Sequence, residues 1–193
     1  MSEAIRNTSM LGAAARFFVS PRASVRAVLD SRPSEGRILA LGMFAGLVLF
    51  ARQMADILSQ PELLQDQTEL VMQSLVSFLF FVPLAYYGVA ALGTAIARLF
   101  GGTGKWYEGR VAFFWAAFIS APVMLLTGIL PLVVPGLPAP FLILVGQIGV
   151  FFFAWAIAQA FAEAFSFTRT WLVLIVVCSP AIVTFVYYLV ATL

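Results

Sequence analysis

The chain has 193 residues, of which 62% are hydrophobic and only 10% are charged, with eleven Lys and Arg against nine Asp and Glu. Soluble domains carry about 25% charged residues, and a small fold has too little interior to hide this many apolar side chains, so the composition identifies a membrane protein. Because there is no His and only one Cys, zinc sites, His-ligated haem, iron–sulfur clusters and His-dependent catalytic triads are excluded.

The N-terminal part of the chain precedes any long apolar run, and we expect residues 1–35 to form a cytoplasmic segment. Within this segment, Ser20 followed by Pro21 is typical of a helix start, because proline at the first helical position lacks only an N–H that would have no partner. The sequence therefore predicts a short amphipathic helix over about 20–30.

This short helix carries basic and apolar residues on adjoining sides, namely Arg22, Arg26, Val25 and Leu29. Apolar burial and the attraction of arginine to anionic lipid hold such helices at the membrane surface. We therefore expect these four residues to contact the bilayer surface. The alternative is that the helix docks a cytosolic protein.

The gaps between charged residues predict five membrane-spanning helices, because the hydrocarbon core needs about 20 apolar residues per helix. Residues 36–193 then form an all-α, five-helix transmembrane domain that follows the interfacial helix. The expected spans are about 36–58, 70–100, 108–134, 140–165 and 169–193. A cluster of prolines and Gly136 predicts a tight hairpin between the third and fourth spans.

The orientation of the bundle follows from its basic residues, which collect on the cytoplasmic side of membrane proteins. With the N-terminus inside, ten of the eleven Lys and Arg lie inside and only Arg52 lies outside. Five spans then place the C-terminus outside.

The connection between the second and third spans reads Gly-Gly-Thr-Gly at residues 101–104, ahead of Lys105. A phosphate-binding loop would need glycine at Leu99 and serine or threonine at Trp106, so nucleotide chemistry is not expected. We expect instead a flexible glycine turn followed by a membrane-surface anchor that consists of Lys105, Trp106 and Arg110.

Three of the expected spans carry a proline near mid-depth, namely Pro83, Pro122 and Pro180. A proline frees the carbonyl four residues before it, which must find another partner in lipid. The three kinks either let the helices bend around one another, which we favour, or open a cavity at the midplane.

A polar stripe lies toward the cytoplasmic end of the fourth span, where Glu163 follows Gln159 and Trp155 at one-turn intervals. Intramembrane polar groups face protein rather than lipid. We expect Glu163 to form a structural ion pair with Arg169 or Arg98, and a proton-relay role is the alternative.

Small residues predict how the spans pack, because they let helix backbones approach closely where lipid provides no hydrophobic drive. Gly42 and Gly46 form a Gly-x-x-x-Gly pattern in the first span, which we assign to a contact within the bundle rather than to a homodimer. The fourth span has alanines on two faces and is the expected centre of the bundle; these alanines are Ala154, Ala156, Ala158, Ala160, Ala162 and Ala164.

Three features are similar to the bacterial branch of the Yip domain family, the Ypt-interacting-protein type of five-span membrane proteins. They are Ser20-Pro21, the loop 101–104 with Trp106, and the third-span segment Phe118-Ile119-Ser120-Ala121-Pro122. The resemblance covers about 15–190 and implies five helices, a cytoplasmic N-terminus and a bacterial inner membrane. For eukaryotic members it implies binding to Rab-type GTPases, but this chain lacks their acidic, aromatic N-terminal segment, and no GTPase is assigned to it.

The function expected from these features is that of a non-enzymatic integral membrane protein without cofactor, metal or nucleic acid. It would organise the membrane or bind a protein partner through its basic cytoplasmic face, in contact with the bilayer and its anionic lipid. The alternative is a small transporter or channel that uses a proline-kinked cavity. The sequence favours the first function, because charged groups at mid-depth and internal repeats, which are typical of transporters, are not seen.

Overall fold

The computed structural model of the chain describes residues 10–58 and 74–179, and helices form nearly all of these ranges. In chain order the helices are α2 (Met10–Phe17), α3 (Pro21–Ser31), α4 (Glu35–Leu58), η2 (Ser77–Phe81), α6 (Val82–Leu99), α7 (Trp106–Val133), α8 (Ala139–Ala164) and a last helix, Thr170–Ser179. No strand occurs within the described ranges, and the all-α prediction is confirmed.

Four helices are long and apolar enough to cross a membrane, namely Glu35–Ala55, Ser74–Leu99, Trp106–Val133 and Pro140–Ala164. They correspond to the first four expected spans. The fifth expected span is described only as the helix Thr170–Ser179, and the remainder, with Pro180, lies outside the described residues.

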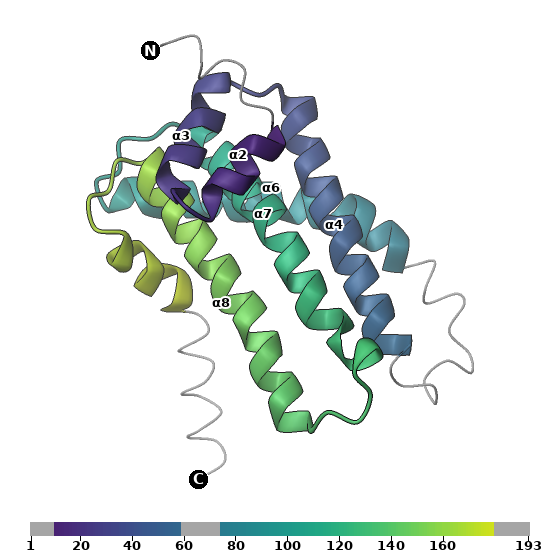
Figure 1. Ribbon diagram of the computed structural model, residues 1–193. Helices are drawn as coiled ribbons and strands as arrows, with labels where there is room; N and C mark the ends of the chain where they lie inside the picture. The colour runs from purple at the N-terminus through teal and green to yellow at the C-terminus, as the bar shows by residue number, and fades with distance from the viewer. Residues whose placement is uncertain (1–9, 59–73, 180–193) are drawn as a thin grey trace.

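The tight turn between the third and fourth spans lies where the prolines predict it. Helix α7 ends at Val133 and α8 begins at Ala139, directly after Pro138. Gly136 has a φ of 84°, a left-handed conformation that side chains disfavour, so glycine makes the sharp reversal possible. The two helices therefore pack side by side as an antiparallel pair (Figure 1).

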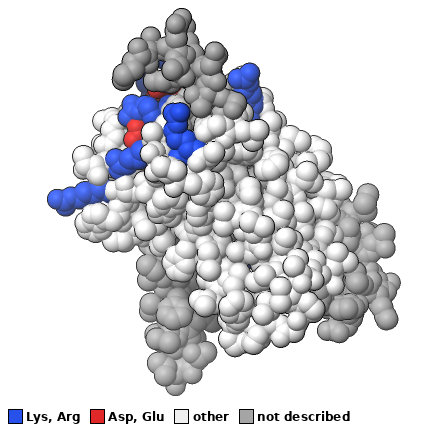
Figure 2. Space-filling view, viewed as in Figure 1, with Lys and Arg blue, Asp and Glu red and all other residues white. Residues whose placement is uncertain are grey.

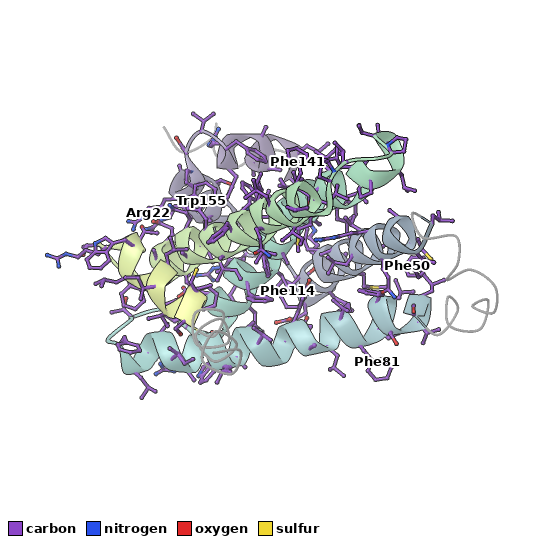
Figure 3. All side chains as sticks on the ribbon, turned by 90° about the horizontal axis from the view of Figure 1, so that it is seen from below. Arg22, Phe50, Phe81, Phe114, Phe141 and Trp155 are labelled. Carbon is purple, nitrogen blue, oxygen red and sulfur yellow. The ribbon has the colours of Figure 1, made fainter. Side chains whose placement is uncertain are left out.

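The centre of the bundle is α7, which contacts α4, α6, α8 and α3. The prediction that the fourth span, α8, is central was wrong. Small residues allow close approach, but α7 also buries a run of large side chains, Phe113, Phe114 and Trp115, that fills the space between its neighbours. Figure 3 shows Phe114 among the helices, whereas Phe81 points away from them.

Pro83 explains an irregular turn in the second span. Proline has no N–H, and its ring would clash with the carbonyl of Leu79 in a regular helix. The backbone takes the wider π-helical form over η2, and the Val82 N–H donates to the carbonyl of Ser77, five residues back. The helix thereby continues through the proline from Ser74 to Leu99.

The described prolines do not face one another across the bundle. Pro83 is buried, whereas Pro122 is exposed on the outer side of α7, which continues through it to Val133. Because they lie in such different surroundings, the described part of the chain provides no support for a cavity shared by the kinks.

The two glycines of the first span pack inside the bundle, as predicted. Gly42 lies against the ring of Phe114 on α7, and Gly46 lies against the backbone carbonyl of Phe78 in η2. A side chain at either position would overlap these neighbours. The Gly-x-x-x-Gly pattern therefore serves close contact of α4 with α7 and η2 within one chain.

We predict that Gly46→Ala destabilises the folded protein by about 1 to 3 kcal/mol, because the new Cβ would fall on the Phe78 carbonyl oxygen, an overpacking that backbone atoms cannot relieve. Gly88→Ala is the matched control, since nothing lies within 4 Å of a Cβ there. It should raise stability by up to about 1 kcal/mol, because alanine favours the helix. Thermal unfolding in detergent measures both, and equal stability of the two variants would contradict the packing.

Candidate functional site

All charged residues of the described chain except Arg52 and Asp56 gather at one end of the bundle, which we call the charged end. Here α2 and α3 meet the starts of α4 and α7 and the ends of α6 and α8. Figure 2 shows Lys, Arg, Asp and Glu side chains at this end, while the other described residues on the visible face are uncharged. The nine basic residues are Arg16, Arg22, Arg26, Arg32, Arg37, Arg98, Lys105, Arg110 and Arg169, against four acidic residues, Asp30, Glu35, Glu108 and Glu163.

The first two described helices form a hairpin that packs across this end, over α7 and α8 (Figure 1). Phe17 of α2 and Val25 and Val28 of α3 are buried in the main core cluster. Leu29, at the edge of α3, packs partly buried against the same cluster. The α2–α3 hairpin is therefore part of the folded bundle.

A buried serine joins three helices beneath this hairpin. The Ser24 hydroxyl of α3 donates to the Ala13 carbonyl of α2 over 2.7 Å, and the Trp115 indole N–H of α7 donates to Ser24 Oγ over 3.3 Å. Ser24 and Trp115 are both fully buried. Because an unpaired polar group is costly in an apolar interior, this chain of bonds specifies how the hairpin sits.

Two arginines tie α3 to the end of α8. The Arg26 Nε donates to Glu163 Oε1 over 2.5 Å, and the pair forms a salt bridge. Arg22 donates to the Phe167 carbonyl over 2.9 Å and to Thr170 Oγ1 over 2.6 Å, beyond the end of α8. The predicted partners of Glu163, Arg169 and Arg98, were therefore wrong, because α3 brings Arg26 to the carboxylate first.

The polar stripe of α8 faces the hairpin. The Trp155 ring packs edge-on against Phe17, with ring centroids 5.5 Å apart, and Glu163 pairs with Arg26. Gln159 lies half-buried between these two positions on the helix. Figure 3 shows Trp155 and Arg22 on the side of the molecule where the N-terminal helices lie. The stripe therefore faces protein, and α3 is the partner that the sequence did not indicate.

The predicted surface contacts of α3 need correction, because Val25 is buried and both arginines already have partners in the bundle. The apolar side chains that point outward belong instead to α2 and the turn after it. Val19, Leu11 and Phe18 are 85%, 77% and 58% exposed. The apolar run Phe17-Phe18-Val19 was the sequence signal for this outward surface. Phe17 is buried, whereas Phe18 and Val19 are exposed.

The glycine loop between α6 and α7 is packed rather than flexible, which corrects the prediction. Gly102 and Gly104 lie against the Phe165 ring and nearby carbonyls so closely that a side chain would overlap them. The Thr103 N–H donates to the Phe165 carbonyl over 3.3 Å. This loop therefore holds the segment that follows α8.

The expected surface anchor after this loop divides into two parts. Lys105 and Trp106 are exposed, and the Arg98 guanidinium lies 5.8 Å from the centre of the Trp106 ring. Arg110, in contrast, points into the bundle end and pairs with Glu35 over 2.8 Å. Lys105 and Trp106 are thus exposed and could contact the membrane surface, whereas Arg110 links α7 to α4 through its ion pair with Glu35.

No three of the His, Cys, Asp and Glu residues that the structure describes come close enough together to hold a metal ion. Exposed basic groups beside outward apolar side chains fit an anionic lipid surface, because the charges meet headgroups while the apolar side chains enter the acyl region.

A comparison with protein-family models gives one match, to the Yip1 domain, over residues 15–192. This range includes the end of α2, all of α3 and all four described long helices. Neither a curated protein nor a solved structure matches the chain.

We predict that Ser24→Ala lowers the free energy of unfolding by about 1 to 3 kcal/mol, because it leaves the buried Trp115 N–H without a partner and removes the bond to Ala13. Ser31→Ala is the control, since the Ser31 hydroxyl bonds the Val28 carbonyl at an exposed position, and it should cost less than about 0.5 kcal/mol. Denaturant unfolding in detergent measures both. Equal losses would contradict the role of Ser24.

Proposed function

The chain belongs to the Yip1 domain family, and from this membership and the geometry of the charged end we propose that it is a non-enzymatic integral membrane protein that organises its own membrane. The observation that carries this proposal is a hairpin bonded to α7 and α8 with Leu11, Phe18 and Val19 turned outward. These side chains would enter the acyl region of one leaflet, with Phe18 reaching Phe152, about halfway along α8.

Rigid attachment gives this insertion a mechanical consequence. An interfacial helix that is free in the membrane adjusts its depth and position to the lipid around it. The α2–α3 hairpin, in contrast, is held to α7 by Ser24 and to α8 by Arg26, and the Phe18 ring stacks on Phe152 of α8 at 5.7 Å. It would therefore act as a fixed wedge that widens one leaflet beside the bundle.

The orientation we propose places the charged end in the cytoplasm and the protein in a bacterial inner membrane. Support comes from the nine basic residues at this end, because short cytoplasmic segments are enriched in Lys and Arg. The helix Thr170–Ser179 begins beside Arg169 at the same end, and we propose that it starts the fifth span, so that the C-terminus lies outside.

The other functions considered have less support. A protein partner would bind through exposed groups at the charged end such as Lys105 and Trp106, but no observation identifies its chemistry. Transport through a proline-kinked cavity is not favoured, since Pro83 is buried, Pro122 is exposed, and neither lines the described groove.

We predict that the protein concentrates on highly curved vesicles, because a wedge in one leaflet is best accommodated where that leaflet is expanded. Fluorescent protein reconstituted into vesicles of mixed diameter measures this as protein density against vesicle size. Phe18→Ser with Val19→Ser should abolish the enrichment. Ala23→Ser, at an exposed position of α3, is the control and should leave it unchanged. Enrichment that survives loss of both apolar side chains would contradict the proposal.

The five-span orientation has a separate test in reporter fusions. A reporter placed after Lys105 should be active on the cytoplasmic side, and one placed after Leu193 should be active on the opposite side. A cytoplasmic readout from both fusions would show that the chain crosses the membrane an even number of times, contrary to the proposed topology.

A further inference from the structure

A groove lies between α6, α8 and the helix Thr170–Ser179, and it encloses about 530 Å³. This volume lies within the range of pockets that hold small molecules, about 300 to 1,000 Å³. Its walls are almost entirely apolar. They include Val89, Leu92 and Ile96 of α6, Phe161 of α8, and Leu172 and Val176 of the last helix.

The groove is polar only at the charged end. Thr168 and Arg169, in the loop after α8, line it there, and Arg169 is the one charged residue among the described residues that form its walls. From Arg169 to Val177 the wall helix advances about 12 Å, at 1.5 Å per residue. A single leaflet of a hydrocarbon core about 30 Å thick is about 15 Å deep, so the groove fits within one leaflet.

Arg169 is available to bind an anion. In the part of the chain that the structure describes, its side chain takes part in no ion pair or hydrogen bond, and it is exposed. The nearest acidic residue in the sequence, Glu163, is paired with Arg26. No acidic side chain described in the structure lines the groove, so nothing there opposes a negative charge.

The loop that carries Arg169 is held in place from both sides. Arg22 bonds the Phe167 carbonyl and Thr170 Oγ1, which flank Thr168 and Arg169. The Phe167 N–H also donates to the Ala162 carbonyl over 2.8 Å, which anchors the loop to the end of α8. Arg22 thus acts as a positioning residue for the mouth of the groove.

We propose that this groove binds one phospholipid of the leaflet at the charged end, with an acyl chain between the helices and the anionic headgroup at Arg169 and Thr168. An acyl chain matches walls that offer no polar group, and its phosphate would lie where the basic loop meets the headgroup level. Basic pockets between membrane helices on the cytoplasmic side are known as headgroup sites for anionic lipids. This site is separate from the membrane contact of α2 and does not depend on the wedge.

The test uses the full-length protein in detergent, with dioleoyl phosphatidylglycerol and dioleoyl phosphatidylcholine added in equal amounts and bound lipid counted by native mass spectrometry. We expect wild type to retain one phosphatidylglycerol in preference to phosphatidylcholine. Arg169→Gln should weaken phosphatidylglycerol binding about fivefold and leave phosphatidylcholine binding unchanged. Arg37→Gln, which removes an exposed charge at the same end but outside the groove, should change neither.

Two further variants separate the groove from the rest of the molecule. Val89→Trp fills the apolar wall and should reduce retention of both lipids, provided that the variant elutes as a single species with wild-type helicity. If it does not fold, Leu172→Trp takes its place. Phe18→Ser with Val19→Ser should retain lipid like wild type, even if it abolishes curvature sensing.

Three results would overturn the proposal: equal retention of the two lipids by wild type, wild-type preference in Arg169→Gln, or unchanged retention in the folded groove-filling variant. A dimer seen by native mass spectrometry for wild type but not for the groove-filling variant would also overturn the proposal, because a second copy of the chain would then occupy the groove.

Discussion

The arrangement of the charged end depends on one buried hydroxyl group, that of Ser24. It accepts a hydrogen bond from Trp115 on α7 and donates one to Ala13 on α2, so three helices meet at a single polar atom. The hydrophobic effect contributes little to the association of helices in lipid, so it does not favour one packing arrangement over another. Buried polar groups do, because each must find a hydrogen-bond partner. The hairpin therefore has one position on the bundle rather than several equivalent ones.

Other features follow from this docking. It places Arg26 beside Glu163 and Arg22 beside the loop that follows α8. These arginines therefore bond segments that are far apart in the sequence, where they would otherwise contact lipid or water. The same loop is held from its other side by the glycine turn, through Thr103 and Phe165. The N-terminal hairpin thereby also fixes the mouth of the groove at the opposite edge of α8.

The sequence predicted the four described long helices to within a few residues, because charges, glycines and prolines mark where an apolar helix ends. It also assigned Gly42 and Gly46 correctly to a contact within the chain. It did not predict which side of α3 is buried, since an apolar stripe such as Val25 and Val28 fits lipid and protein equally well. The sequence also did not predict the partner of Glu163 or the central position of α7. Both depend on how helices that are distant in the sequence pack together, and no local sequence pattern determines this.

The central claim is that α3 is a docked part of the bundle and not a helix free at the membrane surface. Hydrogen exchange of the backbone amides of residues 24–29, in the full chain reconstituted in vesicles, tests it most directly. Docking predicts that these amides exchange as slowly as those of the buried residues 111–117 of α7, because opening them requires the Ser24 bonds and the Arg26–Glu163 pair to break. Exchange at the rate of an isolated surface helix, within seconds to minutes while α7 stays protected, would contradict the account.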